Sequence, residues 1–81
     1  MNFLTIADHI DHFTDAERQL TREYDEMADL HARAIDIGVP FRELLNLEKE
    51  MNTVLVKRAE VRRTLAYWER IDQEYPREEY E

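Results

Sequence analysis

The chain of 81 residues contains no cysteine and no serine, one glycine and two prolines. Without cysteine it can form neither a disulfide nor a thiolate zinc site, two common ways of stabilising a very small domain. No apolar run approaches the ~20 residues that span a bilayer, and the N-terminus carries no signal-peptide pattern. The sequence therefore predicts no membrane segment and a cytoplasmic protein. A domain of this size is expected to depend on regular helix packing or on a partner chain.

The side chains and motifs that enzymes commonly use are also scarce. The lack of cysteine and serine removes the commonest nucleophiles, and a single glycine excludes a glycine-rich phosphate loop. We therefore expect no enzymatic activity and no cofactor.

Helix-forming residues dominate what is present. The chain is 43% hydrophobic and 37% charged, too apolar for a disordered chain, and it is rich in Leu, Ala, Glu, Arg and Met. The strongest internal break is Gly38-Val39-Pro40, and Pro76 marks a second stop. We predict one all-α domain over residues 1–81, with helical arms 3–37 and 41–75, a turn at 38–40 and an acidic tail at 76–81.

Apolar side chains recur in steps of three and four in both arms, which predicts helix packed on helix. The first arm contributes Phe13, Ala16, Leu20, Glu23, Met27, Leu30, Ala34 and Ile37. The second contributes Leu44, Leu47, Met51, Val54, Arg58, Val61, Leu65, Trp68, Asp72 and Tyr75. If the arms fold back on each other, the numbers of facing residues add up to about 78. The prediction is an antiparallel helical hairpin.

The first arm shows a possible interruption. Two three-residue steps, from Ile10 to Phe13 to Ala16, coincide with a capping-box pattern at Thr14 and Glu17. This favours a break near Thr14 over one continuous helix 3–37. A short N-terminal third helix could then cover Leu65 and Trp68.

The apolar stripes are wider than one helix pair can cover. A second copy covering the open side predicts a homodimeric four-helix bundle, and the monomeric three-helix fold is the alternative. Glu23 and Arg58 interrupt the two seams about one turn out of register, and we expect them to pair.

Charge is unevenly distributed along the chain. Residues 1–37 carry nine acidic and three basic side chains, and residues 38–71 carry seven basic and five acidic ones. Lys57, Arg58, Arg62 and Arg63 form the densest basic cluster. Acidic residues of the first arm could neutralise it, or it could bind an anionic, nucleotide-like ligand, with Lys57, Arg62 and Arg63 as the patch.

Two further site hypotheses are weaker. Asp8, His9, Asp11, His12 and Asp15 could grip a divalent ion, but no Glu-x-x-His motif accompanies them, and we predict no metal. Leu30, Ala34, Gly38, Val39, Leu44 and Leu47 have the spacing of a DNA-binding helix-turn-helix. Its second helix, however, offers few cations on a chain of net charge −8, so we expect no nucleic-acid partner.

Protein binding is the function that the sequence favours. Tyr67, Arg70 and Tyr80 are aromatic or cationic residues outside the seam, of the kind found in interaction hot spots. The expected role is a non-catalytic protein-binding module, such as a small acidic inhibitor or adaptor that docks on a basic surface. The alternatives are a DNA-binding regulator and a bundle that sequesters a nucleotide-like ligand.

Overall fold

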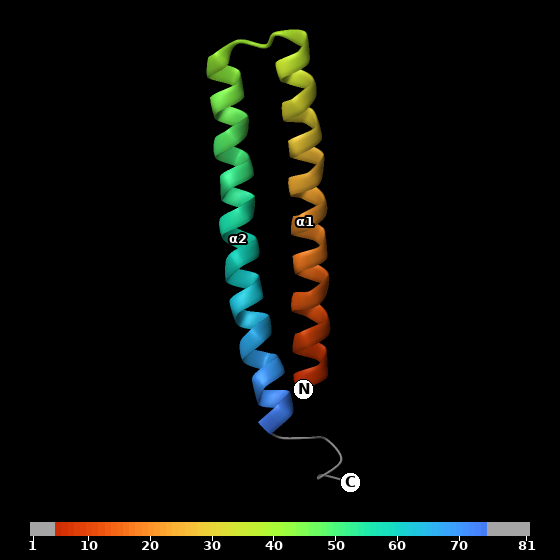
Figure 1. Cartoon of the computed structure of the whole chain (residues 1–81). Helices are drawn as coiled ribbons and strands as arrows, with labels where there is room; N and C mark the ends of the chain where they lie inside the picture. The colour runs from red at the N-terminus through yellow and green to blue at the C-terminus, as the bar shows by residue number, and fades with distance from the viewer. Residues whose placement is uncertain (1–4, 75–81) are drawn as a thin grey trace, which may run out of the picture.

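The computed structural model describes residues 5–74, which form two long α-helices. Helix α1 runs from Ile6 to Ile37 and helix α2 from Phe41 to Glu74. They lie side by side and antiparallel, with the turn at one end of the molecule (Figure 1). The predicted all-α hairpin is confirmed. Residues 1–4 and 75–81, which include the predicted tail and Tyr80, lie outside the described residues.

Helix α1 begins with a capping box at Thr5 and Asp8. The Asp8 backbone amide donates to Thr5 Oγ1, and the Thr5 amide donates to Asp8 Oδ2, both at 3.1 Å. These bonds satisfy amides that have no partner within the helix. The break predicted near Thr14 is wrong, because α1 continues without interruption through that residue.

The turn at Gly38 has the geometry of a Schellman motif. Gly38 adopts a left-handed conformation with φ 81°, and its amide donates to the Ile35 carbonyl at 3.1 Å. The Val39 amide donates to the Ala34 carbonyl at 3.0 Å. Two of the last carbonyls of α1 are thereby satisfied. The Pro40 carbonyl then accepts the first hydrogen bonds of α2.

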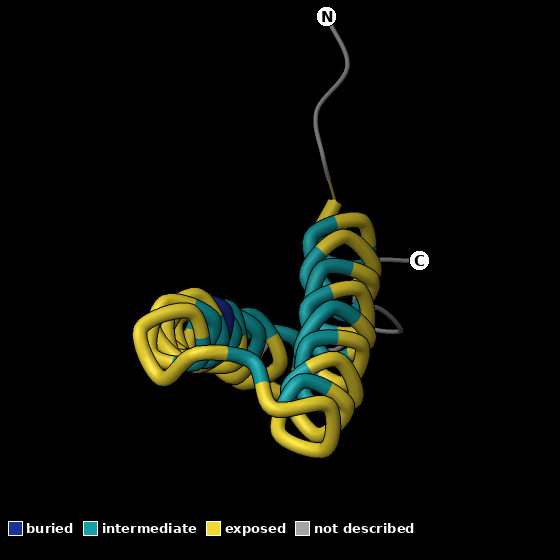
Figure 2. Tube along the Cα trace, turned by 90° about the horizontal axis from the view of Figure 1, so that it is seen from above, coloured by how far each residue is buried: buried dark blue, intermediate teal, exposed yellow. Residues whose placement is uncertain are grey.

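The hairpin is long and thin. Its principal extents are 61 × 22 × 16 Å and its radius of gyration is 18.2 Å, against about 12 Å for a compact domain of this length. Among the described residues only Val54 is buried, with 6% of its surface exposed. Figure 2 shows the less exposed faces of the two helices turned toward each other and an exposed surface around the rest. In the described residues the core is therefore a single line of contact between two helices. Neither described helix has an apolar stretch that could cross a bilayer.

Helix α2 packs through the seam that its sequence predicts. Every member of that seam from Leu44 to Asp72 is buried or partly covered. In helix α1 the members of the predicted seam from Phe13 to Met27 and Ala34 are partly covered, but Leu30 and Ile37 are 57% and 78% exposed. Glu17, Tyr24 and His31 are partly covered in the same helix. Helix α1 is thus rotated relative to the prediction.

This rotation also removes the irregular spacing near Thr14. Ala16 and Glu17 are both partly covered; counted through Glu17, the step after Phe13 is four residues, and the three-four repeat continues without a defect. Glu17, Tyr24 and His31 are spaced by seven residues, so they form one line along the helix. A search for apolar periodicity does not detect this line, because two of its three residues, Glu17 and His31, are polar.

Replacing Gly38 should destabilise the hairpin through its backbone. A Cβ at this position meets nothing within 4 Å, so the cost comes from the left-handed conformation. We expect Gly38→Ala to lower the free energy of unfolding by about 1–2 kcal/mol, measured by urea denaturation at fixed protein concentration. Gly38→Asn should cost less, because asparagine tolerates this conformation. Equal stability of the parent and Gly38→Ala would contradict the turn geometry.

Candidate functional site

The described residues offer surfaces rather than an enclosed pocket. Their best-formed hollow lies on the outer face of α1 alone, between the long polar side chains of Asp15, Arg18, Gln19, Arg22, Glu23 and Glu26. Helix α2 contributes nothing to its lining. The candidate functional sites are therefore the flanks, the outer faces and the ends of the hairpin.

Three polar contacts cross from one helix to the other. Arg62 Nε donates to Glu17 Oε1 at 2.9 Å, and His31 Nε2 lies 3.1 Å from Glu48 Oε1. Arg58 Nη1 donates to Thr21 Oγ1 at 3.4 Å. In each pair the two residue numbers add up to about 79, close to the predicted register. Because Glu17 and His31 share one line of α1, and Glu48 and Arg62 one line of α2, these two contacts lie on one flank of the seam.

Arg58 does not pair with Glu23. Besides its hydrogen bond to Thr21, its guanidinium carbon lies 5.8 Å from the centre of the Tyr24 ring, within the range of a cation–π contact. No hydrogen bond or ion pair joins Glu23 to Arg58 in the part of the chain that the structure describes. The rotation of α1 explains the difference, because it brings Tyr24 rather than Glu23 over α2.

The flank with these contacts also carries most of the small and apolar residues outside the seam. We call it the apolar flank. Its α1 members are Thr14, Thr21, Ala28 and Ile35, spaced by seven, and its α2 members are Phe41, Leu45, Leu55, Ala59 and Ala66. Phe41 is 73% exposed and Ile35 is 54% exposed. Glu48 and Arg62 also lie on this flank, and their side chains contact His31 and Glu17 of α1.

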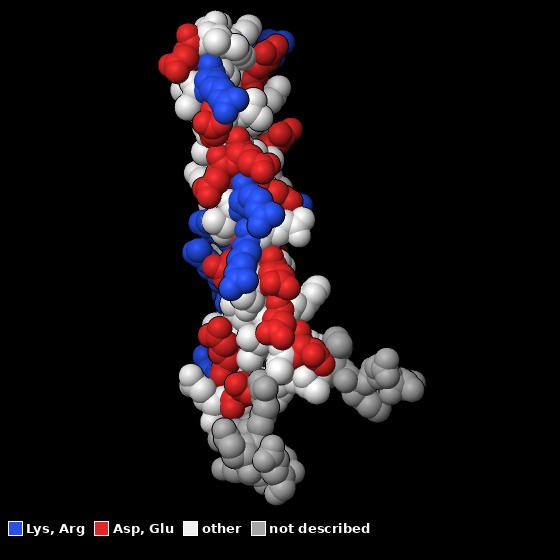
Figure 3. All heavy atoms as spheres, turned by 90° about the vertical axis from the view of Figure 1, so that its right-hand side faces the viewer, with Lys and Arg blue, Asp and Glu red and all other residues white. Residues whose placement is uncertain are grey.

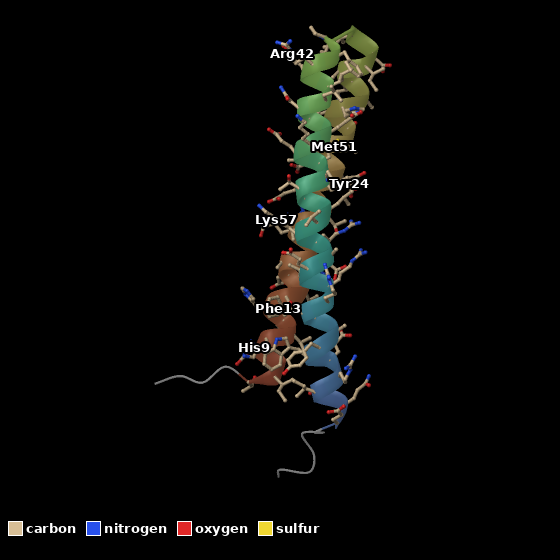
Figure 4. The ribbon with its side chains drawn as sticks, turned by 90° about the vertical axis from the view of Figure 1, so that its left-hand side faces the viewer. His9, Phe13, Tyr24, Arg42, Met51 and Lys57 are labelled. Atoms are coloured by element: carbon tan, nitrogen blue, oxygen red, sulfur yellow. The ribbon has the colours of Figure 1, made fainter. Side chains whose placement is uncertain are left out.

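The structure does not gather the predicted basic cluster into one patch. Arg62 is paired with Glu17, and Arg58 is partly covered beside Tyr24. Lys57 and Tyr24 lie on opposite sides of the hairpin (Figure 4). Arg63 is exposed, and its Nε donates to the Ala59 carbonyl of the same helix at 3.5 Å. Neighbouring residues of a helix point in different directions. Residues that are close in the sequence therefore need not form one patch on the surface.

Aromatic rings gather at the open end of the hairpin. The His9 and Trp68 rings stack with centroids 4.1 Å apart and planes 3° from parallel. Tyr67 packs edge-on against Trp68 at 5.4 Å and stays 55% exposed. Arg70 is also exposed. Of the predicted partner-binding residues, Tyr67 and Arg70 are thus accessible on α2, and Tyr80 falls outside the described range.

The candidate metal ligands are dispersed or engaged elsewhere. Asp8 serves the helix cap, His9 stacks on Trp68, and His12 packs edge-on against Phe13. No group of three or more potential ligands is close enough to hold a metal ion within residues 5–74.

The helix-turn-helix hypothesis also meets a geometric objection. The two helices of that motif cross at about 90–120°, which leaves the second helix free to enter a groove. Here α1 and α2 run antiparallel and stay side by side along their length (Figure 1). This arrangement argues against the motif.

No protein family model matches this chain, and no curated protein or solved structure shows significant similarity to it.

Double-mutant cycles should distinguish the two proposed partners of Arg58. Combining Arg58→Met with Tyr24→Leu should give a coupling energy of about 0.5–1 kcal/mol from the lost cation–π contact. Combining Arg58→Met with Glu23→Gln should give a value near zero. Urea denaturation of the single and double variants measures both. A larger coupling to Glu23 than to Tyr24 would contradict the observed packing of α1.

Proposed function

We propose that this chain is a non-catalytic protein-binding module whose working form is a homodimer. In this proposal two hairpins pack their apolar flanks together into a four-helix bundle. The observation that carries the proposal is that a single described residue, Val54, is buried, while large apolar side chains such as Phe41 and Ile35 stay exposed. A lone hairpin with so little buried surface is poorly stabilised, because apolar burial is the main favourable term in folding.

The exposed apolar side chains support a second copy as the cover. Ile35, Phe41 and Leu45 are 54%, 73% and 38% exposed. A two-fold axis would bring the same surface of another copy against all three of them.

The residues of the apolar flank are suited to close helix packing. Ala28, Thr21 and Thr14 on α1 and Ala59 and Ala66 on α2 are small, so another helix can approach closely. Phe41 and Leu45 can pack on the Ile35 of a second copy, because these residues lie near one level of the hairpin. A two-fold axis parallel to the helices places each α1 beside the α2 of the other chain.

The charge distribution supports the same pairing. Helix α1 carries nine acidic and three basic side chains, and α2 carries seven of each. In a bundle with this symmetry, each α1 contacts the two neutral α2 helices, and the two acidic α1 helices lie diagonally opposite each other. Repulsion between the acidic helices is thereby reduced.

Charges on the apolar flank should separate the dimer. We expect Ala59→Lys with Ala66→Lys to shift the protein from dimer to monomer, because two cations would be placed in the interface. Sedimentation equilibrium over a range of concentrations measures the mass. A matched control is Asn46→Lys with Thr53→Lys, which adds the same two charges at the same spacing on α2 but away from the apolar flank.

The control variant should remain dimeric. A parent protein that stays monomeric at high concentration would overturn the proposal. Equal loss of dimer in both double variants would show that charge rather than position matters, and it would also count against the apolar flank.

A further inference from the structure

We infer that the outer faces of α1 and α2 bind each other between neighbouring copies, so that hairpins add side by side into a ribbon. The charged rows of these faces point away from the seam. They lie outside the apolar flank, although its residues Leu45, Ala59 and Ala66 form the line next to the basic row. The inference does not depend on the dimer proposed above. It rests on two rows of charge that match each other level by level.

The outer face of α1 carries an acidic row. The row consists of positions spaced by seven residues: Asp8, Asp15, Arg22, Asp29 and Asp36, all of them exposed. This spacing places them on one line of the helix, opposite the seam residues Phe13, Leu20 and Met27. Figure 3 looks at this side of the molecule and shows acidic side chains along the length of the face, interrupted by arginine.

The outer face of α2 carries a basic row with the same period. Its members are Arg42, Lys49, Val56, Arg63 and Arg70, all of them exposed. Arg42 is seen at the turn end in Figure 4, which looks at this side of the molecule. Both neighbouring lines of α2 are mostly uncharged: one consists of Leu45, Asn52, Ala59, Ala66 and Gln73, and the other of Asn46, Thr53, Glu60, Tyr67 and Glu74. The four cations therefore dominate the outer face.

The two rows are in register. The numbers of residues at one level of the hairpin add up to about 79, as the contacts of Arg62 with Glu17 and of His31 with Glu48 show. When each residue of the acidic row is paired with one of the basic row, their residue numbers add up to 78. Each member therefore has a counterpart at its own level of the hairpin. The pairs are Asp36 with Arg42, Asp29 with Lys49, Arg22 with Val56, Asp15 with Arg63, and Asp8 with Arg70.

Within one hairpin these pairs cannot meet, because both helices lie between them. They can meet when a second hairpin lies beside the first in the same orientation, with its α2 against the α1 of the first. Four levels then bring opposite charges together. At the fifth, the only cation of the acidic row faces Val56, the only uncharged residue of the basic row.

The neighbouring positions are compatible with the same contact. On one side of the rows the facing residues are His12 with Tyr67, Gln19 with Glu60, Glu26 with Thr53, and Arg33 with Asn46. On the other side they are Asp11 with Ala66, Arg18 with Ala59, Asp25 with Asn52, and Ala32 with Leu45. None of these pairs brings two like charges together. Charge complementarity across a whole face is what selects one partner and one register.

The predicted contact joins two different surfaces of the same chain. Such a heterologous contact leaves an acidic face free at one end and a basic face free at the other, so it generates an open ribbon. The net charge of −8 opposes long ribbons. We therefore expect short oligomers that form at high protein concentration and low ionic strength.

A charge swap tests the rows. The first variant, D15K/D36K, changes the net charge of the α1 row from −3 to +1, and the second, R42E/R63E, changes that of the α2 row from +4 to 0 at the same levels. Each variant alone should self-associate about tenfold more weakly than the parent, because two attractive pairs become repulsive. An equimolar mixture of the two should recover the association of the parent, since the four charged levels then join opposite charges again. Sedimentation velocity at one low ionic strength measures all samples.

A third variant separates the rows from net charge. E43K/E50K changes the total charge by the same amount as D15K/D36K but leaves both rows intact. If net charge alone governs association, both variants should associate more strongly than the parent, because each is less negative. The proposed contact predicts instead that D15K/D36K associates less and E43K/E50K at least as well as the parent. Circular dichroism confirms that each variant stays helical.

An A28K/I35K background, which charges the α1 side of the apolar flank and no position that faces the rows, separates this contact from the proposed dimer. Association through the rows should persist there at low ionic strength, whether or not the apolar flank forms a dimer. The inference is overturned if the mixture does not recover association, or if D15K/D36K associates as strongly as E43K/E50K. It is also overturned if the parent shows no association beyond the dimer, as expected if the acidic row serves a basic surface on another protein.

Discussion

Two helices placed side by side share only one line of contact, and this constraint governs the whole hairpin. Each helix can cover one face against the other, and the remainder of both surfaces stays exposed to solvent. Val54 is accordingly the single buried residue between Thr5 and Glu74. In a larger domain the apolar residues outside the seam would have further elements to pack on. Here Ile35, Phe41 and Leu45 have none within the described residues and stay exposed.

Polar residues at the edge of the seam determine which surface is left over. Glu17 and His31 face Arg62 and Glu48 across one flank, and Tyr24 receives the guanidinium of Arg58. Individually such exposed contacts contribute little to stability. They lie on the side of α1 where the small residues from Thr14 to Ala28 belong to the apolar flank, while Leu30 and Ile37 are exposed. The orientation of one helix about its own axis thus fixes the surface available to a partner.

Helix α1 is acidic and α2 carries most of the cations. In the hairpin the charged outer faces of the two helices point in opposite directions. An acidic segment followed by a more basic one is compatible with many arrangements. Once the segments fold back on each other in register, rows spaced by seven residues point in opposite directions and match by level. Within α1, Asp29 pairs with Arg33 and Asp8 accepts from the Thr5 amide, but the two rows do not meet each other within one chain. We regard this as the feature of the molecule that most directly suggests contacts between copies.

The candidate sites were less predictable than the fold. Lys57, Arg58, Arg62 and Arg63 are close in sequence, but a helix distributes four such residues over most of its circumference. The pairing expected between Glu23 and Arg58 depended on the orientation of α1, which periodicity left open. The sequence does not predict Tyr24 and Thr21 as contacts of Arg58, because the predicted seam of α1 does not include them. The sequence predicts a capping box at Thr14 and the structure has one at Thr5, since both positions satisfy the local pattern and only the packed helix distinguishes them.

The sequence by itself determined the helices, the turn at Gly38, the seam of α2 and the register within about one residue. These features follow from local chemistry: three-four periodicity, helix propensity, and the left-handed conformation that glycine adopts without strain. Only the tertiary structure decided which stripe α1 presents to α2. Ala16, Glu23 and Leu30 lie on one side of the line through Phe13, Leu20 and Met27, and Glu17, Tyr24 and His31 on the other. The choice between them depends on side chains that α2 supplies, and no single-helix pattern contains that information.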